Sequence, residues 1–238
     1  MRVLLTGDSH LHALEAGRAL LEGGKDARGI DVVIHPMGSG EWVRDPFFID
    51  RGTYAELVHP GRRIDQLPPA KEKFDLIGFS SPMHTARVWR MDWHEYDIWS
   101  NAKYGAPNLI SNDVFRKIIF DDVAQLLSLL EVVNRTVEVF VVEAPWPFLH
   151  HKAVKLNGRR RVSYINRFYR NYVRERLIEN NIPLVEVERS WISPSGFMHS
   201  RFKSALEGDP HHANSEFGRL MMKRVFDFLA SRSARAVA

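Results

Sequence analysis

Two short segments near opposite ends of the chain carry residues that could together do acyl-transfer chemistry. Residues 7–10 (Gly-Asp-Ser-His) follow the first apolar run, and residues 209–214 (Asp-Pro-His-His-Ala-Asn) lie near the other end. A histidine can abstract the proton of a serine hydroxyl and later return it, while a carboxylate holds the imidazole in the required tautomer. Asp209 and His212 are close enough in sequence to act as such a unit on one loop, so they predict a base for Ser9.

Ser9 lies where a strand is expected to give way to a helix. Backbone amides at a helix N-terminus have no partner within the helix, and the helix dipole is positive there, so an oxyanion formed on Ser9 would be stabilised. A serine at this position can instead serve only as a helix N-cap. Similarly, residues 209–214 can be an ordinary surface loop with a histidine pair. Considered together, the two segments favour a catalytic triad of Ser9, His212 and Asp209.

The chain between these segments alternates predicted strands and helices. Five short apolar runs predict parallel strands, because their hydrophobicity is continuous, as in strands that helices cover on both faces. Segments with an apolar period near 3.6 follow most of these runs and predict helices. The predicted strands are 2–6, 31–37, 74–79, 137–143 and 183–187; the predicted helices are 11–22, 113–134, 163–180 and 215–231, with a frayed tail after Arg232.

These segments, in this order, resemble the SGNH (GDSL-like) esterases and lipases. Gly7, Asp8 and Ser9 match the first block of that family, and residues 209–214 match its last block. The resemblance spans essentially the whole chain. It implies a flavodoxin-like three-layer α/β/α sandwich with a five-stranded parallel sheet in the order 2-1-3-4-5. It also implies that Ser9, His212 and Asp209 form the triad of a serine esterase.

The middle blocks match the family less closely. The second block supplies a glycine amide after the second strand, and Gly40 is the better match, although glycines at this point can also serve only a tight turn. The third block usually supplies an asparagine side chain, and Ser80 and Ser81 occupy its place. Because loss of one oxyanion donor typically costs about 2.7 to 4 kcal/mol, we expect a replacement. The predicted oxyanion hole is Ser9, Gly40 and Ser81, with Ser80, His84 and Asn101 as other candidates for the third donor.

Two stretches, 38–73 and 80–111, are too long for simple connections, which in α/β folds run about 2 to 6 residues. We expect a single SGNH-hydrolase-like domain over residues 1–238 that carries both as insertions. Ligands of open α/β sheets bind beyond the carboxyl ends of the strands, where both stretches leave the sheet. The second is rich in aromatic residues, which suit a sugar ring and a buried core equally. The predicted substrate-binding residues are His84, Trp89, Trp93 and Trp99.

Composition limits the remaining classes of protein. The formal net charge of +4 would suit an anionic partner, but no nucleic-acid-binding module accompanies the arginines of 159–176, so we do not expect nucleic acid as a partner. The absence of cysteine excludes disulfides, thiolate zinc sites and cysteine nucleophiles. No run approaches the roughly 20 apolar residues of a membrane span, and no signal-peptide layout is present. We therefore expect a cytoplasmic protein without a membrane partner.

Two pairs of adjacent histidines, at 150–151 and 211–212, invite a search for a metal site. Adjacent residues on an extended chain point to opposite faces, and no further ligand spacing accompanies either pair. We therefore expect no metal, and no cofactor.

The expected function is hydrolysis of an ester through an acyl-enzyme on Ser9. The first choice of substrate is a small molecule or saccharide with an O-acyl or O-acetyl group. Two alternatives remain: an O-acyltransferase that uses the same triad on a saccharide, and a non-catalytic saccharide- or nucleic-acid-binding protein with the same fold. Since one fold hosts many functions, the fold does not choose among them.

Overall fold

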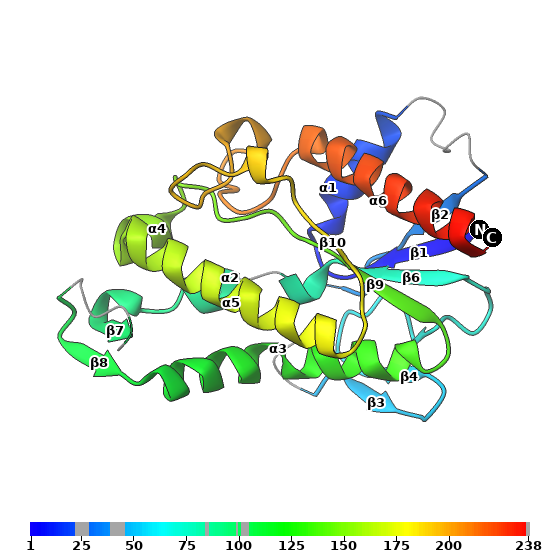
Figure 1. Cartoon of the computed structure of the whole chain (residues 1–238), viewed down its shortest axis with the longest axis horizontal. Coiled ribbons are helices and arrows are strands. Elements are labelled where there is room, and N and C mark those ends of the chain that lie inside the picture. The colour runs from blue at the N-terminus through cyan, green and yellow to red at the C-terminus, as the bar shows by residue number, and fades with distance from the viewer. Residues whose placement is uncertain (22–28, 39–45, 84–85, 99, 101–104, 237–238) are drawn as a thin grey trace.

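Five parallel strands form the central sheet (Figure 1). The computed structural model describes residues 1–21, 29–38, 46–83, 86–98, 100 and 105–236. The strand order is β10-β9-β6-β1-β2, which is 2-1-3-4-5 when these five strands are numbered along the chain. Every neighbouring pair is parallel, so the predicted fold class is confirmed. The strands are β1 (Arg2–Thr6), β2 (Asp31–Ile34), β6 (Leu76–Phe79), β9 (Glu138–Val142) and β10 (Leu184–Val185).

Helices cover both faces of this sheet, as Figure 1 shows. On one face, Val3 and Leu5 of β1 pack in a core with α1 (Leu11–Ala19) and α6 (Ser215–Ala236). On the other face, Leu4 packs in a second core with α3 (Asn112–Asn134) and α5 (Arg159–Glu179). Successive residues of a strand point to opposite faces of the sheet. Because each face packs against a core, the side chains on both faces are apolar, which explains the continuous hydrophobicity of the strands. A short helix, α4 (Lys152–Asn157), precedes α5.

Several predicted bounds differ from the structure. Helix α5 begins at Arg159, four residues before the predicted start, and α6 continues to Ala236, so the prediction of a frayed tail after Arg232 is wrong. Val114, which the helical period places on the apolar face of α3, is 50% exposed.

The two stretches predicted as insertions contain secondary structure of their own. Residues 46–73 form an antiparallel sheet of three strands, and residues 80–111 contain a parallel pair with short helices. Buried side chains from both stretches, including Phe47, Leu57 and Ile98, join the core that α3 and α5 share. The elements are β3 (Phe48–Asp50), β4 (Ala55–Leu57), β5 (Gln66–Leu67), η2 (Ser81–Met83), α2 (Ala86–Trp89), η3 (Trp93–Glu95), β7 (Tyr96–Ile98) and β8 (Asn108–Ile110); η5 (Arg189–Trp191) and η6 (Ser200–Phe202) precede α6.

Helices α1 and α6 meet at two glycines. A Cβ atom on Gly17 would overlap the backbone of Gly218 and Arg219, and a Cβ on Gly218 would overlap the carbonyl of Ala13. Only glycine permits this backbone contact. Since α1 follows Ser9 and α6 follows His212 in the chain, the contact fixes how closely those two residues approach.

The arginines of α5 do not all face solvent. Arg170 is 1% exposed and pairs with the buried Glu143 at 2.7 Å. It also donates to the carbonyl oxygens of Ala144 and Pro145, while Glu143 accepts from the backbone N–H of Val187. This network joins α5 to the carboxyl ends of β9 and β10.

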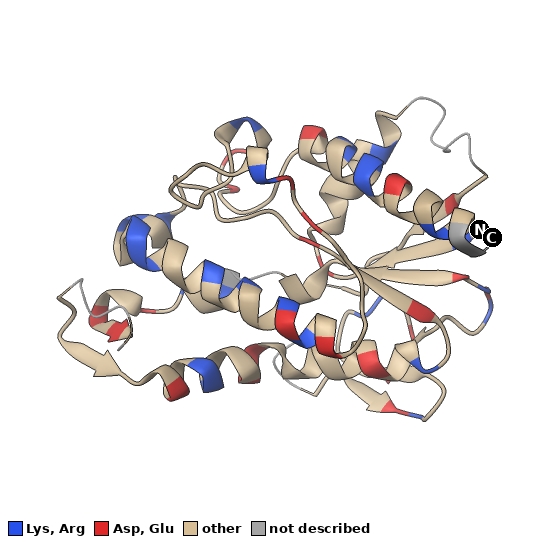
Figure 2. Ribbon diagram, viewed as in Figure 1, with Lys and Arg blue, Asp and Glu red and all other residues tan. Residues whose placement is uncertain are grey.

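Charges on the outer surfaces of the helices are interspersed. Figure 2 shows Asp and Glu beside Lys and Arg on α3, α5 and α6. Arg174 of α5, for example, pairs with Glu186 at 2.6 Å. Within the described ranges, no helix is both long and apolar enough to cross a membrane.

Candidate active site

Ser9 lies in the turn between β1 and α1, at the carboxyl edge of the sheet. The turn is closed by backbone hydrogen bonds from Leu11 to the carbonyl of Asp8 and from His12 to the carbonyl of Ser9, each 3.2 Å. His10, not Ser9, is the N-cap residue of α1. The hydroxyl of Ser9 instead lies 2.9 Å from Nε2 of His212. The alternative interpretation of Ser9 as the helix cap is therefore wrong.

Asp209 holds the loop that carries His212. Each of its two carboxylate oxygens lies 3.1 Å from Nδ1 of His212. Oδ1 also accepts the backbone N–H groups of His211 and His212, both at 3.0 Å. Asn214 caps the N-terminus of α6, because its side chain accepts from the N–H of Phe217. The same side chain donates to the carbonyl of Arg201. The sequence segment thus folds into a turn in which one carboxylate fixes both the backbone and the imidazole.

The charge state of Asp209 suits this arrangement. Partial burial alone would raise its pKa, but the N–H groups of His212 and His211 and the adjacent His212 ring outweigh burial and lower the pKa of Asp209 to about 2. An ionised carboxylate at Nδ1 favours the neutral tautomer with its proton on that nitrogen. Nε2 then presents a lone pair to the Ser9 hydroxyl. The three side chains form one hydrogen-bonded line of the kind that activates a serine.

Ser80 and Ser81 lie directly after β6, beside the turn that carries Ser9. A Cβ atom on Gly7, whose φ is +143°, would overlap Oγ of Ser80 and lie 2.9 Å from Oγ of Ser81. Both hydroxyls are buried and have no hydrogen-bond partner among the described residues. A buried polar group without a partner is unfavourable, so these hydroxyls are placed to gain from a ligand atom next to Ser9.

Two of the predicted substrate-binding residues, Trp89 and Trp93, lie away from this place. Trp89 and Trp93 are 2% and 3% exposed and belong to the core beneath the second insertion. Trp89 packs its ring edge-on against His151, and Trp93 donates its indole N–H to the carbonyl of Val88. Their prediction as substrate-binding residues is wrong, because neither ring face is open to a ligand. Gly40, His84, Trp99 and Asn101 lie outside the described residues.

An open pocket of about 690 Å³ adjoins the Ser9 hydroxyl. Ser9, Asp209 and His212 are among the residues that line it. Much of the remaining wall comes from apolar side chains of α1 and of the loop before α6, including Ala16 and Leu206. The pocket therefore gives a substrate access to the serine, and an apolar group can lie beside it.

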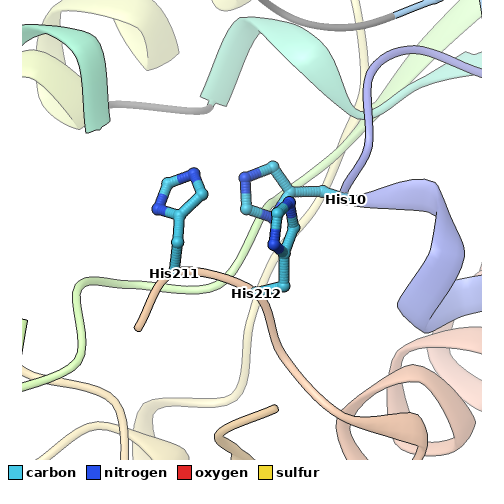
Figure 3. A group of neighbouring side chains, drawn as sticks. All are labelled: His10, His211 and His212. Atoms are coloured by element: carbon cyan, nitrogen blue, oxygen red, sulfur yellow. The ribbon is translucent and has the colours of Figure 1, made fainter. Parts of the chain in front are cut away.

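Sequence reasoning missed His10. Its ring lies 4.9 Å from that of His211 and 5.0 Å from that of His212, measured between centroids. Figure 3 shows the three rings together, with His10 from the start of α1 and the other two from the neighbouring loop. The expectation that His211 and His212 point to opposite faces is wrong, because the segment is a turn closed by Asp209 and not an extended strand. The position of His10 directly after Ser9 was the available signal.

Comparisons with known proteins support the fold. No family model matches the sequence, and no curated protein shows significant sequence similarity to it. Among solved structures, a GDSL-like lipase from Bacteroides thetaiotaomicron is similar with a TM-score of 0.52 and 10% identity, over 98% of this chain and 88% of that one. An acetyl xylan esterase, AlAXEase, is similar with a TM-score of 0.50 and 14% identity, over 95% of this chain and 98% of that one. The chain therefore has the fold of the GDSL-like (SGNH) hydrolases, as the sequence resemblance implied.

Proposed function

We propose that this chain is a serine esterase with Ser9 as nucleophile, His212 as general base and Asp209 as the residue that orients the base. The observation that carries the proposal is the continuous hydrogen-bonded line from Ser9 Oγ through His212 to Asp209. The three residues come from segments at opposite ends of the chain, yet their mutual distances are those of a serine–histidine–carboxylate unit. The GDSL-like fold agrees with this chemistry.

In the first half of the reaction, Nε2 of His212 takes the proton of Ser9 while Oγ attacks the ester carbonyl. His212 then gives that proton to the leaving alcohol, and the acyl group remains on Ser9. In the second half, His212 takes a proton from water, and the resulting hydroxide attacks the acyl-enzyme. The acid leaves, and the proton returns to Ser9.

The negative charge that develops on the carbonyl oxygen needs donors. We assign the first to the backbone N–H of Ser9, at the N-terminal end of α1. The hydroxyl of Ser81 is the second, because it is buried beside Gly7 and has no partner among the described residues. Gly40 supplies the third donor by its match to the family's second block.

The substrate class that we propose is an O-acyl ester, with an O-acetyl group on a saccharide as the first candidate. The fold likeness to an acetyl xylan esterase supports this choice. The pocket beside Ser9 is open, so a bulky alcohol portion can remain outside it while the acyl group reaches Oγ. Because Trp89 and Trp93 are buried, we do not assign recognition of the alcohol portion to either of them.

Turnover of p-nitrophenyl acetate tests the proposal. We expect the wild-type chain to hydrolyse it, and Ser9→Ala and His212→Ala to lose activity while retaining the thermal unfolding midpoint within a few degrees. Acetylated xylan, assayed with and without an added saccharide acceptor, separates hydrolysis from acyl transfer. Activity that survives both substitutions would overturn the triad, and product formed only with the acceptor would replace the esterase by an acyltransferase.

A further inference from the structure

We infer that His10, His211 and His212 form a binding site for a divalent transition metal ion, with Zn²⁺ as the best fit, and that the bound ion switches off the Ser9–His212 pair. One nitrogen from each of the three side chains lies within 4.8 Å of the other two. Three imidazoles with an open fourth position are a zinc donor set that proteins use. The inhibition rests on the proposed function, while the metal site itself does not.

The geometry comes close to a coordinated arrangement without an ion. Zinc binds imidazole nitrogen at about 2.0 to 2.1 Å, so two ligands of one tetrahedral ion lie about 3.4 Å apart. The nitrogen atoms of the three rings therefore need to approach one another by at most about 1.4 Å. Figure 3 shows the three rings gathered in one place, and their centroids lie 4.9 to 5.0 Å apart, so rotation of the side chains can supply this approach.

The turns that carry these ligands are held by carboxylates. Asp209 accepts the backbone N–H groups of both His211 and His212, and Asp8 accepts the N–H of His10 at 3.0 Å. Preorganised segments reduce the entropy that metal binding must overcome. The two carboxylates also place negative charge near a dication.

Asp209 sets the tautomer that both roles need. A metal-binding histidine commonly donates its second ring N–H to a carboxylate, which fixes the tautomer and makes the ligand more basic. Asp209 lies at Nδ1 of His212, so the Nε2 lone pair is the one that is offered. The Ser9 hydroxyl uses that same lone pair. A metal ion at Nε2 and catalysis by His212 therefore exclude each other.

Metal ions can reach the site from solvent. The side chain of His212 is 33% exposed and lines the open pocket beside Ser9. His10 also lines this pocket, although it is only 5% exposed. Binding therefore joins one buried ligand to two ligands on the adjacent loop, which would also hold that loop against α1.

The test combines direct metal binding with activity. Protein freed of metal by EDTA is titrated with ZnCl₂ in competition with a chromophoric chelator, and p-nitrophenyl acetate turnover is measured at the same free Zn²⁺ concentrations. We expect one Zn²⁺ per chain, and about one tenth of the activity remaining when free Zn²⁺ is ten times its Kd. EDTA should restore the activity.

Variants distinguish this site from adventitious binding. His211→Ala removes a ligand and keeps the backbone N–H that Asp209 accepts, so it should bind Zn²⁺ at least about 100-fold more weakly and resist inhibition, because loss of an outer partner alone typically weakens binding by about 10- to 100-fold. His10→Gln should bind more weakly too. Ser9→Ala should bind at least as tightly as wild type, since the competing hydroxyl is gone. The control, His199→Ala, replaces an exposed histidine and should behave as wild type.

Two results would overturn the inference. The first is absence of stoichiometric Zn²⁺ binding to the wild-type chain. The second is binding or inhibition that His211→Ala leaves unchanged. If the wild-type chain shows no esterase activity with any ester, the proposed function fails, but the chelator competition still decides whether the metal site exists.

Discussion

The hydroxyl of Ser9 lies 2.9 Å from Nε2 of His212, although 203 positions separate the two residues along the chain. The two helices that follow them, α1 and α6, meet through Gly17 and Gly218 with no room for a side chain between their backbones. Ser9 lies just before α1, which begins at Leu11, and His212 lies just before α6, which begins at Ser215. The distance between Ser9 and His212, the proposed nucleophile and base, is therefore set by the packing of these two helices.

Replacing Asp209 with Asn should impair chemistry far more than folding. An amide can pair with His212 in the wrong tautomer, which in a well-studied serine protease lowers kcat by about 10⁴-fold. We expect a loss of similar order in kcat for Asp209→Asn, measured by p-nitrophenyl acetate turnover. Glu216→Gln, which changes an exposed carboxylate paired loosely with Arg201, is the control and should remain near wild type. A loss smaller than about tenfold in Asp209→Asn would remove Asp209 from its proposed role.

Ser81→Ala should slow turnover without destabilising the protein. Removing an oxyanion donor lowers kcat by about 10²- to 10³-fold, whereas removing a buried hydroxyl that has no partner among the described residues is neutral or stabilising. We expect reduced kcat together with an unchanged or higher unfolding midpoint. Ser80→Ala provides the comparison, because its hydroxyl is equally buried beside Gly7. If only Ser80→Ala slows turnover, the donor is Ser80 and our assignment is wrong.

Gly218→Ala should separate the two helices. The added Cβ would overlap the carbonyl of Ala13, and overpacking of this kind typically destabilises by about 1 to 3 kcal/mol or more. A shift of about 1 Å between Ser9 and His212 can lower the rate by about 10²-fold. The free energy of unfolding, measured in urea, and kcat should therefore both decrease. Lys223→Ala, at an exposed position of the same helix, should change neither, and a Gly218→Ala variant of normal stability and activity would contradict this description of the contact.

His151 should make the protein less stable as the pH falls. Burial, with the nearby positive charges of Arg90 and Lys152, lowers the pKa of His151 to about 4. The unfolded chain, with an ordinary histidine pKa near 6.5, binds a proton more readily than the folded chain does, so the free energy of unfolding decreases as the pH falls from about 6.5 to about 4. His151 also caps α4 by accepting the N–H of Ala153.

The variant His151→Asn keeps a capping acceptor and removes the titration. Its free energy of unfolding, measured in urea at pH 7 and at pH 4, should change less between the two pH values than that of the wild type. Equal changes in both proteins would show that His151 is not the group responsible.

The sheet was predictable because its strands are apolar on both faces. Continuous apolar runs such as residues 2–6 and 137–143 are typical of strands covered on both faces, and the helical periods between them indicate parallel connections. The segments that contain Ser9 and His212 were predictable for the same reason, since each follows or precedes a clear element. Their contact depends on the packing of α1 against α6, since β10, the last strand before His212, does not neighbour β1 in the sheet.

Other features depended on contacts that no local pattern reports. Arg170 belongs to a helix face that is rich in exposed arginines, and only the position of Glu143 and the nearby carbonyl groups explains its burial. Trp89 and Trp93 could be platform or core, and the packing of the second insertion against α3 and α5 made them core. The convergence of His10 with His211 required the turn that Asp209 closes.

The most direct test of the account is labelling with a fluorophosphonate probe, which reacts with activated serines. After proteolysis, mass spectrometry should locate the label on Ser9, and Ser9→Ala or His212→Ala should abolish the reaction. Native protein that is not labelled at Ser9, or that is labelled equally in His212→Ala, would contradict the central claim that His212 activates Ser9 as a nucleophile.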